Sequence, residues 1–155
     1  MISLKLSGSF LQAIKKAEGE ARNLTKQAVK EASTIVWGAA IKETPVGATG
    51  QLRKGIRRNL YPNKATILPS VNYADPVHEG SKGHAIPVAA MQKGGSLYRW
   101  AKQRGLNPYA VAHKIKQRGT KANPFFTRAV DGTEDEVRRK FDEILGASVR
   151  KMTGS

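Results

Sequence analysis

The chain has 155 residues, of which 39% are hydrophobic and 25% are charged, and this profile is that of one ordinary globular domain. It contains no cysteine, which excludes a disulfide scaffold, a thiolate zinc site and a cysteine nucleophile. No apolar run approaches the roughly 18 residues of a membrane span, and the N-terminus does not resemble a signal peptide, so we expect no membrane partner.

The net charge of +15 is unevenly distributed along the chain. Residues 44–130 contain 15 basic residues and only Asp75 and Glu79 as acids, whereas residues 131–155 contain 5 basic and 6 acidic residues. A field this concentrated attracts a polyanion or the acidic surface of another protein. The middle of the chain is therefore the first candidate for a contact surface.

The first residues alternate between apolar and polar types. Ile2, Leu4 and Leu6 fall on one face of an extended chain, so residues 2–6 predict a short strand. A Ser-Gly-Ser turn follows.

A long helix is predicted next. From about Phe10 the apolar residues recur at steps of three and four, which is the pattern of one helix face. Ser9 and Gln12 have the spacing of a capping box at its start. Thr44-Pro45 ends it, because the residue before a proline is driven out of the helical region.

The region after the helix mixes turns with a predicted hairpin. Residues 44–51 have turn chemistry and no room for a regular element. Residues 55–61 and 65–73 predict two antiparallel strands. Residues 80–95 are rich in glycine and predict an irregular loop with a short strand at about 84–88. Few apolar residues anchor 44–54 or 80–95, so we expect both to be mobile in the isolated chain.

Two short helices are predicted after this loop. Ser96 can cap the first, and Gly105 suits the left-handed position at its end. Asn107 followed by Pro108 predicts the start of the second, which should stop at Gly119.

The last part of the chain predicts an extended segment and a final helix. Pro124-Phe125-Phe126 should be extended, with both rings buried where the chain re-enters the core. Thr133 and Glu136 form a second capping box. Glutamate and aspartate residues stand four positions before Arg138, Arg139 and Lys140. Residues 152–155 should be loose.

These elements predict one α+β domain over residues 1–155. A long N-terminal helix and a C-terminal helix would pack on a small antiparallel sheet, with long loops between. The expected parts are a strand and long helix (1–43), a loop and sheet region (44–95), and short helices with the C-terminal helix (96–150).

One cluster has the residue types of a metal or catalytic site: Asp75, His78, Glu79 and His84. Pro76, Gly80 and Gly83 argue against the helix that a two-histidine zinc motif requires. A metal site in a loop, or a histidine base of a small nuclease, stays open. We favour a turn in which Glu79 pairs with a neighbouring Arg or Lys, and we assign no catalytic, cofactor-binding or metal-ligating residue.

The basic residues supply the contact candidates instead. In residues 98–104 they alternate with aromatic side chains, and we interpret Trp100 as a core anchor rather than a platform for stacked bases. The candidates for contact with DNA or with a partner protein are Arg53, Lys54, Arg57, Arg58, Arg99, Lys102, Arg104, Lys114, Lys116, Arg118 and Lys121.

Several short motifs also occur in a recognisable order. They are Thr44-Pro45-Val46, Thr49-Gly50-Gln51-Leu52-Arg53, Asn72-Tyr73-Ala74, Val77-His78-Glu79-Gly80-Ser81, Gly119-Thr120-Lys121 and Asn123-Pro124-Phe125-Phe126. This series resembles the gene-product-ten-like tail-completion family of long-tailed double-stranded DNA bacteriophages. The resemblance covers roughly residues 8–145.

The resemblance implies a structural virion protein of the neck or tail, without catalysis and without a cofactor. It implies assembly into a homo-oligomeric ring, such as a hexamer, at the point of tail completion or head–tail joining. The implied neighbours are head–tail connector, tail terminator or tail-tube proteins, with packaged DNA as a further contact. The implied location is the virion, and the host cytoplasm during assembly. From the residues alone, a stand-alone basic nucleic-acid-binding protein and a small nuclease remain alternatives.

Overall fold

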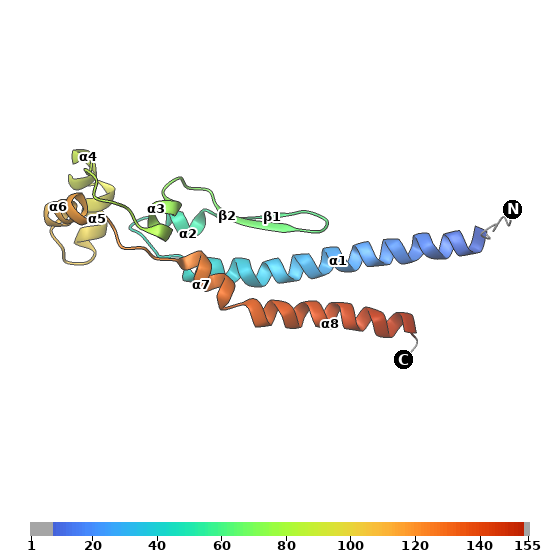
Figure 1. Cartoon of the computed structure of the whole chain (residues 1–155). Coiled ribbons are helices and arrows are strands. Elements are labelled where there is room, and N and C mark those ends of the chain that lie inside the picture. Colours follow the sequence, from blue (N-terminus) through green and yellow to red (C-terminus); the bar gives the residue numbers. More distant parts are fainter. Residues whose placement is uncertain (1–7, 154–155) are drawn as a thin grey trace.

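The computed structural model describes residues 8–153, and it is extended rather than compact (Figure 1). A long helix, α1 (Gly8–Glu43), forms the axis of the molecule, with a β-hairpin on one side and helix α8 (Glu134–Thr153) on the other. The shorter helices lie at the end of the molecule remote from the N-terminus. The α+β class is confirmed, whereas the strand expected at residues 2–6 lies outside the described residues.

Helix α1 is a single helix of 36 residues, which corresponds to about 54 Å. It begins at Gly8, so Ser9 lies within it and not at the N-cap position that we predicted. It ends at Glu43, as Thr44-Pro45 predicts. The buried Thr44 closes the last turn, since its amide and its hydroxyl both donate to the carbonyl oxygen of Ala40.

The predicted hairpin is confirmed in shorter form. Strand β1 (Ile56–Leu60) pairs with β2 (Ala65–Pro69) in antiparallel register, with Arg58 opposite Ile67. The indole Nε1 of Trp37 on α1 donates to the carbonyl oxygen of Ile56 at 3.1 Å, which fixes the hairpin to the helix. One helical turn, α2 (Gln51–Lys54), precedes the hairpin and begins inside a segment where we expected only turns.

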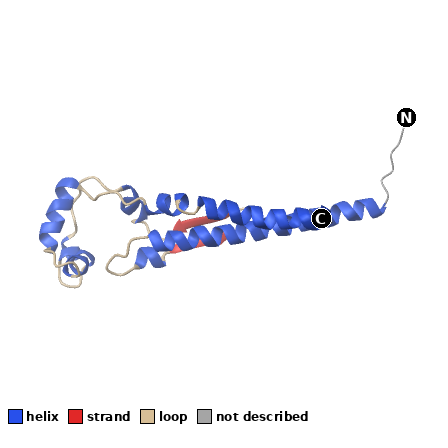
Figure 2. Cartoon of the chain, turned by 90° about the horizontal axis from the view of Figure 1, so that it is seen from below, coloured by secondary structure: helices blue, strands red, loops and turns tan. Residues whose placement is uncertain are grey.

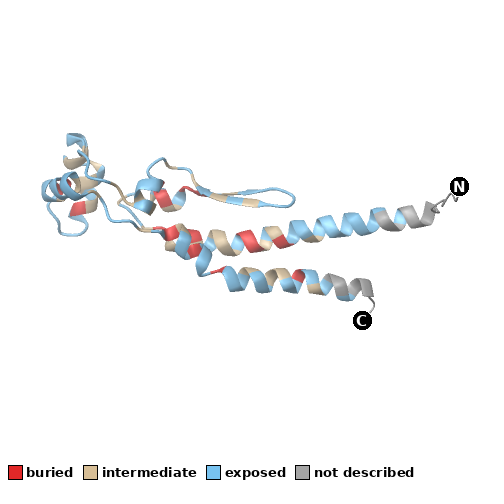
Figure 3. Ribbon diagram, viewed as in Figure 1, coloured by how far each residue is buried: buried red, intermediate tan, exposed pale blue. Residues whose placement is uncertain are grey.

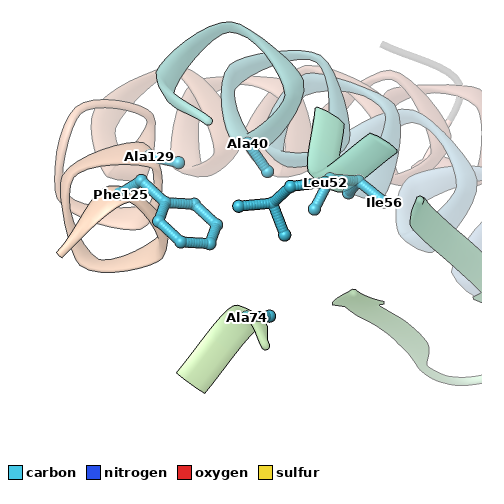
Figure 4. Packing of buried hydrophobic residues seen from close by; sticks show 6 residues of the cluster. All are labelled: Ala40, Leu52, Ile56, Ala74, Phe125 and Ala129. Atoms are coloured by element: carbon cyan, nitrogen blue, oxygen red, sulfur yellow. The ribbon is translucent and has the colours of Figure 1, made fainter. Parts of the chain in front are cut away.

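The core is small and lies where α1, α2, α3 (Ala74–Glu79), α7 (Phe125–Asp131) and the hairpin meet (Figure 4). Its buried residues are Ala40, Leu52, Ile56, Ala74, Phe125 and Ala129. Half of them are alanines, so the elements approach closely but little apolar area is buried. Figure 3 shows that burial is concentrated at this junction and that the described first half of α1 is largely exposed.

Helix α3 (Ala74–Glu79) corrects the expectation that Pro76 argues against a helix here, although the helix ends before Gly80 and does not extend to His84. Pro76 is the third residue of this helix. A first-turn residue has no intrahelical partner for its N–H, so a proline there costs nothing in hydrogen bonding. The helix then stops at Gly80, which has a φ of 83°.

The next helices follow the prediction more closely. Helix α4 (Val88–Met91) replaces the strand expected at 84–88. Helices α5 (Ser96–Lys102) and α6 (Pro108–Arg118) are confirmed, with positive φ at Gly105 and Gly119. The predicted cap at Ser96 is wrong, because Ser96 is the first residue of α5 and Gly95 holds the N-cap position. Asn107 caps α6, because its Oδ1 accepts hydrogen bonds from the amides of Tyr109 and Ala110 at 2.9 and 3.3 Å.

The segment expected to be extended at Phe125 is instead helix α7 (Phe125–Asp131). The predicted capping box at Thr133 is also wrong, because the Thr133 hydroxyl donates back to the carbonyl oxygen of Ala129 at 2.7 Å and so closes α7. Helix α8 continues to Thr153, so Met152 and Thr153 are helical and not loose. The α8 helix packs along α1 (Figure 2).

Candidate functional site

The basic region folds into a lobe of its own at one end of the molecule (Figure 1). Helices α4, α5 and α6 pack on one another there, and residues 80–87 and 119–124 connect them to the rest of the chain. Residues 82–121, named the basic lobe below, contain nine Lys or Arg residues and no Asp or Glu. Much of the excess positive charge is therefore gathered at one end.

The two connections to the basic lobe touch at Ser81 and Thr120. Their main chains exchange two hydrogen bonds of 3.1 Å, and their hydroxyl oxygens lie 2.9 Å apart. Gly119 has a φ of +71°, and a Cβ on it would lie 1.7 Å from the carbonyl oxygen of Ser81. Only glycine permits this approach, so the bridge that joins lobe and body depends on Gly119.

Seven contact candidates lie in the basic lobe: Arg99, Lys102, Arg104, Lys114, Lys116, Arg118 and Lys121. All seven are exposed. The Arg104 guanidinium lies over the Trp100 ring at 4.5 Å from its centroid, and the Lys102 ammonium lies 5.8 Å from that of Tyr98. A ring face covered by a guanidinium is not open to a stacked base, which favours a structural role for Trp100.

The lobe also contains a partly apolar pocket of about 430 Å³ between α5 and α6. Tyr98, Lys102, Leu106, Pro108 and Tyr109 are among its lining residues. Leu106 and Tyr109 are 44% and 58% exposed. Exposed aromatic and aliphatic groups beside cations suit a protein surface with acidic side chains better than a bare phosphate backbone.

The other four candidates lie outside the lobe, on α2 and β1: Arg53, Lys54, Arg57 and Arg58. The Arg53 guanidinium donates to the carbonyl oxygen of Thr44, and that of Arg58 donates to the Thr34 hydroxyl and lies 5.3 Å from the Trp37 ring centroid. Both arginines therefore hold α1 against its neighbours. Lys54 and Arg57 are exposed and stay contact candidates.

The residues of the suspected metal cluster do not converge. His78 packs edge-on against Phe125 at 5.4 Å, and the Nδ1 of His84 lies 3.0 Å from the carbonyl oxygen of Lys82. Among residues 8–153, no three His, Asp or Glu side chains gather as a metal site would require. The turn with a paired Glu79 is wrong as well, because Glu79 lies in α3 and belongs to none of the ion pairs of the described residues.

A second surface feature escaped the sequence analysis. An apolar groove of about 390 Å³ runs between β2 on one side and α7 and α8 on the other, with α1 as its floor. Its main apolar residues are Val29, Val36, Ile67, Phe126, Val130 and Phe141. They come from four elements, so no local pattern marks them. The sequence gives one signal: residues 125–130 contain more apolar side chains than a single buried helix face would need.

The surface area of the molecule is large for its mass. The chain exposes 11445 Å², whereas a compact monomer of 16.9 kDa exposes about 7,700 Å². The fully buried side chains include only one large apolar group, Phe125, among the described residues. A chain with so much exposed area and so small a core is shaped for contact with other molecules.

The model of the family described as "Bacteriophage HK97-gp10, putative tail-component" matches residues 8–97. The match covers α1, the hairpin and the start of the basic lobe, which is more than half of the chain. The chain belongs to this bacteriophage tail-component family. No curated relative and no solved structure matches it.

Family membership assigns the chain a structural role in the phage tail and a place in the virion. It also implies contacts with other head or tail proteins. Within the described part of the chain, none of the helices combines the length and the apolar character that a bilayer crossing demands. The basic lobe and the apolar groove are the two surfaces of this tail component that are best suited to such contacts.

Proposed function

We propose that the chain is a ring-forming subunit of the phage neck or tail end, where it acts in tail completion or head–tail joining. The observation that carries the proposal is the exposed area of this tail component. Its excess over a compact monomer is several thousand Å², and a standard interface buries about 800 Å² on each partner. There is room for two such patches on each subunit, which is what a ring requires.

The basic lobe is the proposed contact with the next layer of the assembly. Fixing nine like charges in one lobe raises the electrostatic energy of the free chain, and an anionic partner relieves it. We favour the acidic face of a neighbouring ring, formed by connector, terminator or tail-tube proteins, over packaged DNA. The pocket at Tyr98 and Tyr109 supports this choice, because rings beside cations anchor protein interfaces.

Two alternatives make different demands. A stand-alone nucleic-acid-binding protein would grip DNA as a monomer, in a way that weakens steeply with salt. A small nuclease would use His78, Glu79 or His113, and His113 stands exposed on α6 in the lobe. Neither alternative explains the large exposed area of the chain.

The test combines mass with location. Native mass spectrometry of the purified chain, alone and with tail and connector proteins, should give a multiple of the subunit mass. Imaging of the virion at subnanometre resolution should place the chain in a ring at the neck or tail end. A chain that remains monomeric in every mixture and is missing from virions would refute the proposal.

A further inference from the structure

The apolar groove has one side formed by the free edge of a β-strand. Ala65 and Ile67 of β2 line the groove, whereas no residue of β1 does. In the described residues the sheet consists of β1 and β2 alone. The groove therefore runs along a sheet edge that has no neighbouring strand there.

The main-chain hydrogen bonds of the hairpin show which groups of β2 face its free edge. The amide of Tyr61 donates to the carbonyl oxygen of Lys64, and the amide of Ser70 donates to the carbonyl oxygen of Gly55, both at 2.8 Å. Because bonded and non-bonded pairs alternate in an antiparallel ladder, the main-chain groups of Ala65 and Ile67 point away from β1, toward the free edge. The same two residues direct their side chains into the groove.

A strand that filled this site would need a particular pattern. Its main chain would pair with Ala65 and Ile67, and every second side chain would be apolar and enter the groove. Residues 2–6 of this chain have that pattern, with Ile2, Leu4 and Leu6 alternating with Ser3 and Lys5. A third strand would also stabilise a two-stranded sheet, which is marginal by itself.

The segment cannot reach the groove of its own subunit. The floor of the groove on α1 begins at Val29, which lies about 31 Å along the helix axis from Gly8. Ile2 stands six residues before Gly8 and can extend at most about 22 Å from it. Leu4 and Leu6 fall shorter still. Residues 2–6 could therefore fill only the groove of a different molecule.

We propose that residues 2–6 of one copy add to the β2 edge of a neighbouring copy and place Ile2, Leu4 and Leu6 in its apolar groove. This inference rests on the proposed ring, whose subunit contact it specifies. The contact is heterologous, since the arm and the groove are different surfaces of the same chain. Repeated around an axis, such a contact closes a ring.

The absence of cysteine from the chain permits a direct test. The double variant Leu4→Cys/Val130→Cys places one thiol on the arm and one in the groove, at a position that is 52% exposed and so accessible to the reagent. A short bifunctional thiol reagent is applied to the purified protein and to assembled tails that contain the variant. We expect a ladder of covalently linked multimers on a denaturing gel.

The matched control is Ser3→Cys/Val130→Cys, whose arm thiol would face away from the groove. We expect loss of most of the ladder with this variant. A second control, Leu4→Cys/Val88→Cys, moves the acceptor thiol to an exposed site in the basic lobe and should give no ladder. Equal ladders from Leu4 and Ser3 would overturn the proposed strand.

Each other outcome is also decisive. A linked species of single-chain mass would show that the arm folds onto its own subunit, against the reach argument. A multimeric mass without a ladder in either sample would refute the arm contact and leave the proposed function standing, with another segment or protein in the groove. A linked dimer formed by the single variant Val130→Cys would show that two grooves face each other.

Discussion

Arg53 donates two hydrogen bonds to the carbonyl oxygen of Thr44, at 3.1 Å from Nε and 2.8 Å from Nη2. A third, from Nη2 to the carbonyl oxygen of Lys42, measures 3.2 Å. These carbonyls belong to the C-terminal end of α1, where main-chain acceptors lack partners and a cation is favoured by the helix dipole. A residue that the sequence marks as a contact candidate therefore holds the loop after α1 in place.

We expect Arg53→Gln to lower the free energy of unfolding by about 1.5–3 kcal/mol, the range for hydrogen bonds made by charged groups. Its neighbour Lys54, exposed on the same helical turn, provides the matched control. Lys54→Gln removes the same charge and should change stability by less than about 0.5 kcal/mol. Urea unfolding of both variants measures the difference. An equal loss of unfolding free energy in both would show that the hydrogen bonds of Arg53 do not stabilise the fold.

The apolar stripe of α1 has two parts with different roles. Ala28 and Ala32 are buried, whereas Ala17 and Ala21 are exposed and Leu24 is half-buried between them. Because periodicity records only that one face is apolar, the sequence could not show where burial begins along a helix that extends past its own core.

This division predicts unequal costs for two leucine truncations. Leu52→Ala, in the core and 4% exposed, should cost about 2–5 kcal/mol in the free protein. Leu24→Ala should cost only about 1–2 kcal/mol there, because Leu24 is half-buried and lies outside the core cluster. Thermal and urea unfolding of the two variants test this. A loss at Leu24 equal to that at Leu52 would show that its face is already covered in the monomer.

Much of the fold follows from signals that are local in the sequence. The end of α1 at Thr44-Pro45, the hairpin, the Asn107 cap and the stop at Gly119 are each set by one or two residues acting on their own backbone. The errors occur where tertiary contacts decide. Thr133 fits a capping box, but in the structure its hydroxyl closes the preceding helix.

Of the two candidate surfaces, one can be predicted from local signals in the sequence and the other depends on tertiary contacts. The basic lobe is predictable, since its charge is contiguous in the chain and no acid interrupts it. The apolar groove is not, because α1, β2, α7 and α8 each contribute only a few residues to it. Arg53 and Arg58 show the limit of charge counting, as a cation near a helix end or an indole ring can be internal to the fold.

Helix α8 is attached to α1 partly through Lys140. Its ammonium lies 2.6 Å from the Glu143 carboxylate and 3.9 Å from that of Glu31 on α1. The hydrogen bond to Glu143 raises the pKa of Lys140, and the same bond lowers the pKa of Glu143. The sequence had predicted Glu136 as the partner of Lys140, four residues before it.

A carboxyl whose pKa is lower in the folded state stabilises the fold above its unfolded pKa and loses this contribution as pH falls through the folded value. We therefore expect the Glu143 contribution to be present at neutral pH and lost in the acid range. Glu143→Gln should also lower the pKa of Lys140 toward its ordinary value. NMR titration of the Lys140 side chain measures this, with Glu134→Gln on the same helix as control. If the pKa of Lys140 does not change in Glu143→Gln, Glu31 is its dominant partner.

The bridge between lobe and body gives a prediction for proteolysis. Gly119→Ala should separate Ser81 from Thr120, because the added methyl group overlaps the Ser81 carbonyl oxygen. We expect trypsin to cut at Lys82 and Lys93 faster in this variant, and to cut at Arg53 at an unchanged rate. Gly105 also has a positive φ but open space around it, so Gly105→Ala controls for backbone strain alone. Equal rates in the two variants would show that the bridge does not hold the lobe.

The last prediction concerns the partner of the basic lobe. The triple variant Arg99→Gln/Lys102→Gln/Arg104→Gln removes three exposed cations of α5 and of the turn that follows it. Its matched control removes three exposed cations of α1 that precede the buried Ala28, as Lys15→Gln/Lys16→Gln/Lys26→Gln, so that the net charge of the two proteins is identical. Two quantities are measured for each: incorporation into tails and binding to duplex DNA over a range of salt.

If the lobe docks on an acidic protein ring, the α5 variant should lose incorporation while the control retains it, and both should bind DNA equally weakly. If the lobe grips phosphates, DNA binding of the unmodified protein should fall with salt by about 0.9 log units per decade for each phosphate contact. The plot of log K against log salt concentration should then be less steep for the α5 variant by the amount expected for about three phosphate contacts. The slope for the control should not change. Normal incorporation of the α5 variant into tails, together with this weaker salt dependence, would show that the lobe contacts DNA in the channel and not a neighbouring protein ring.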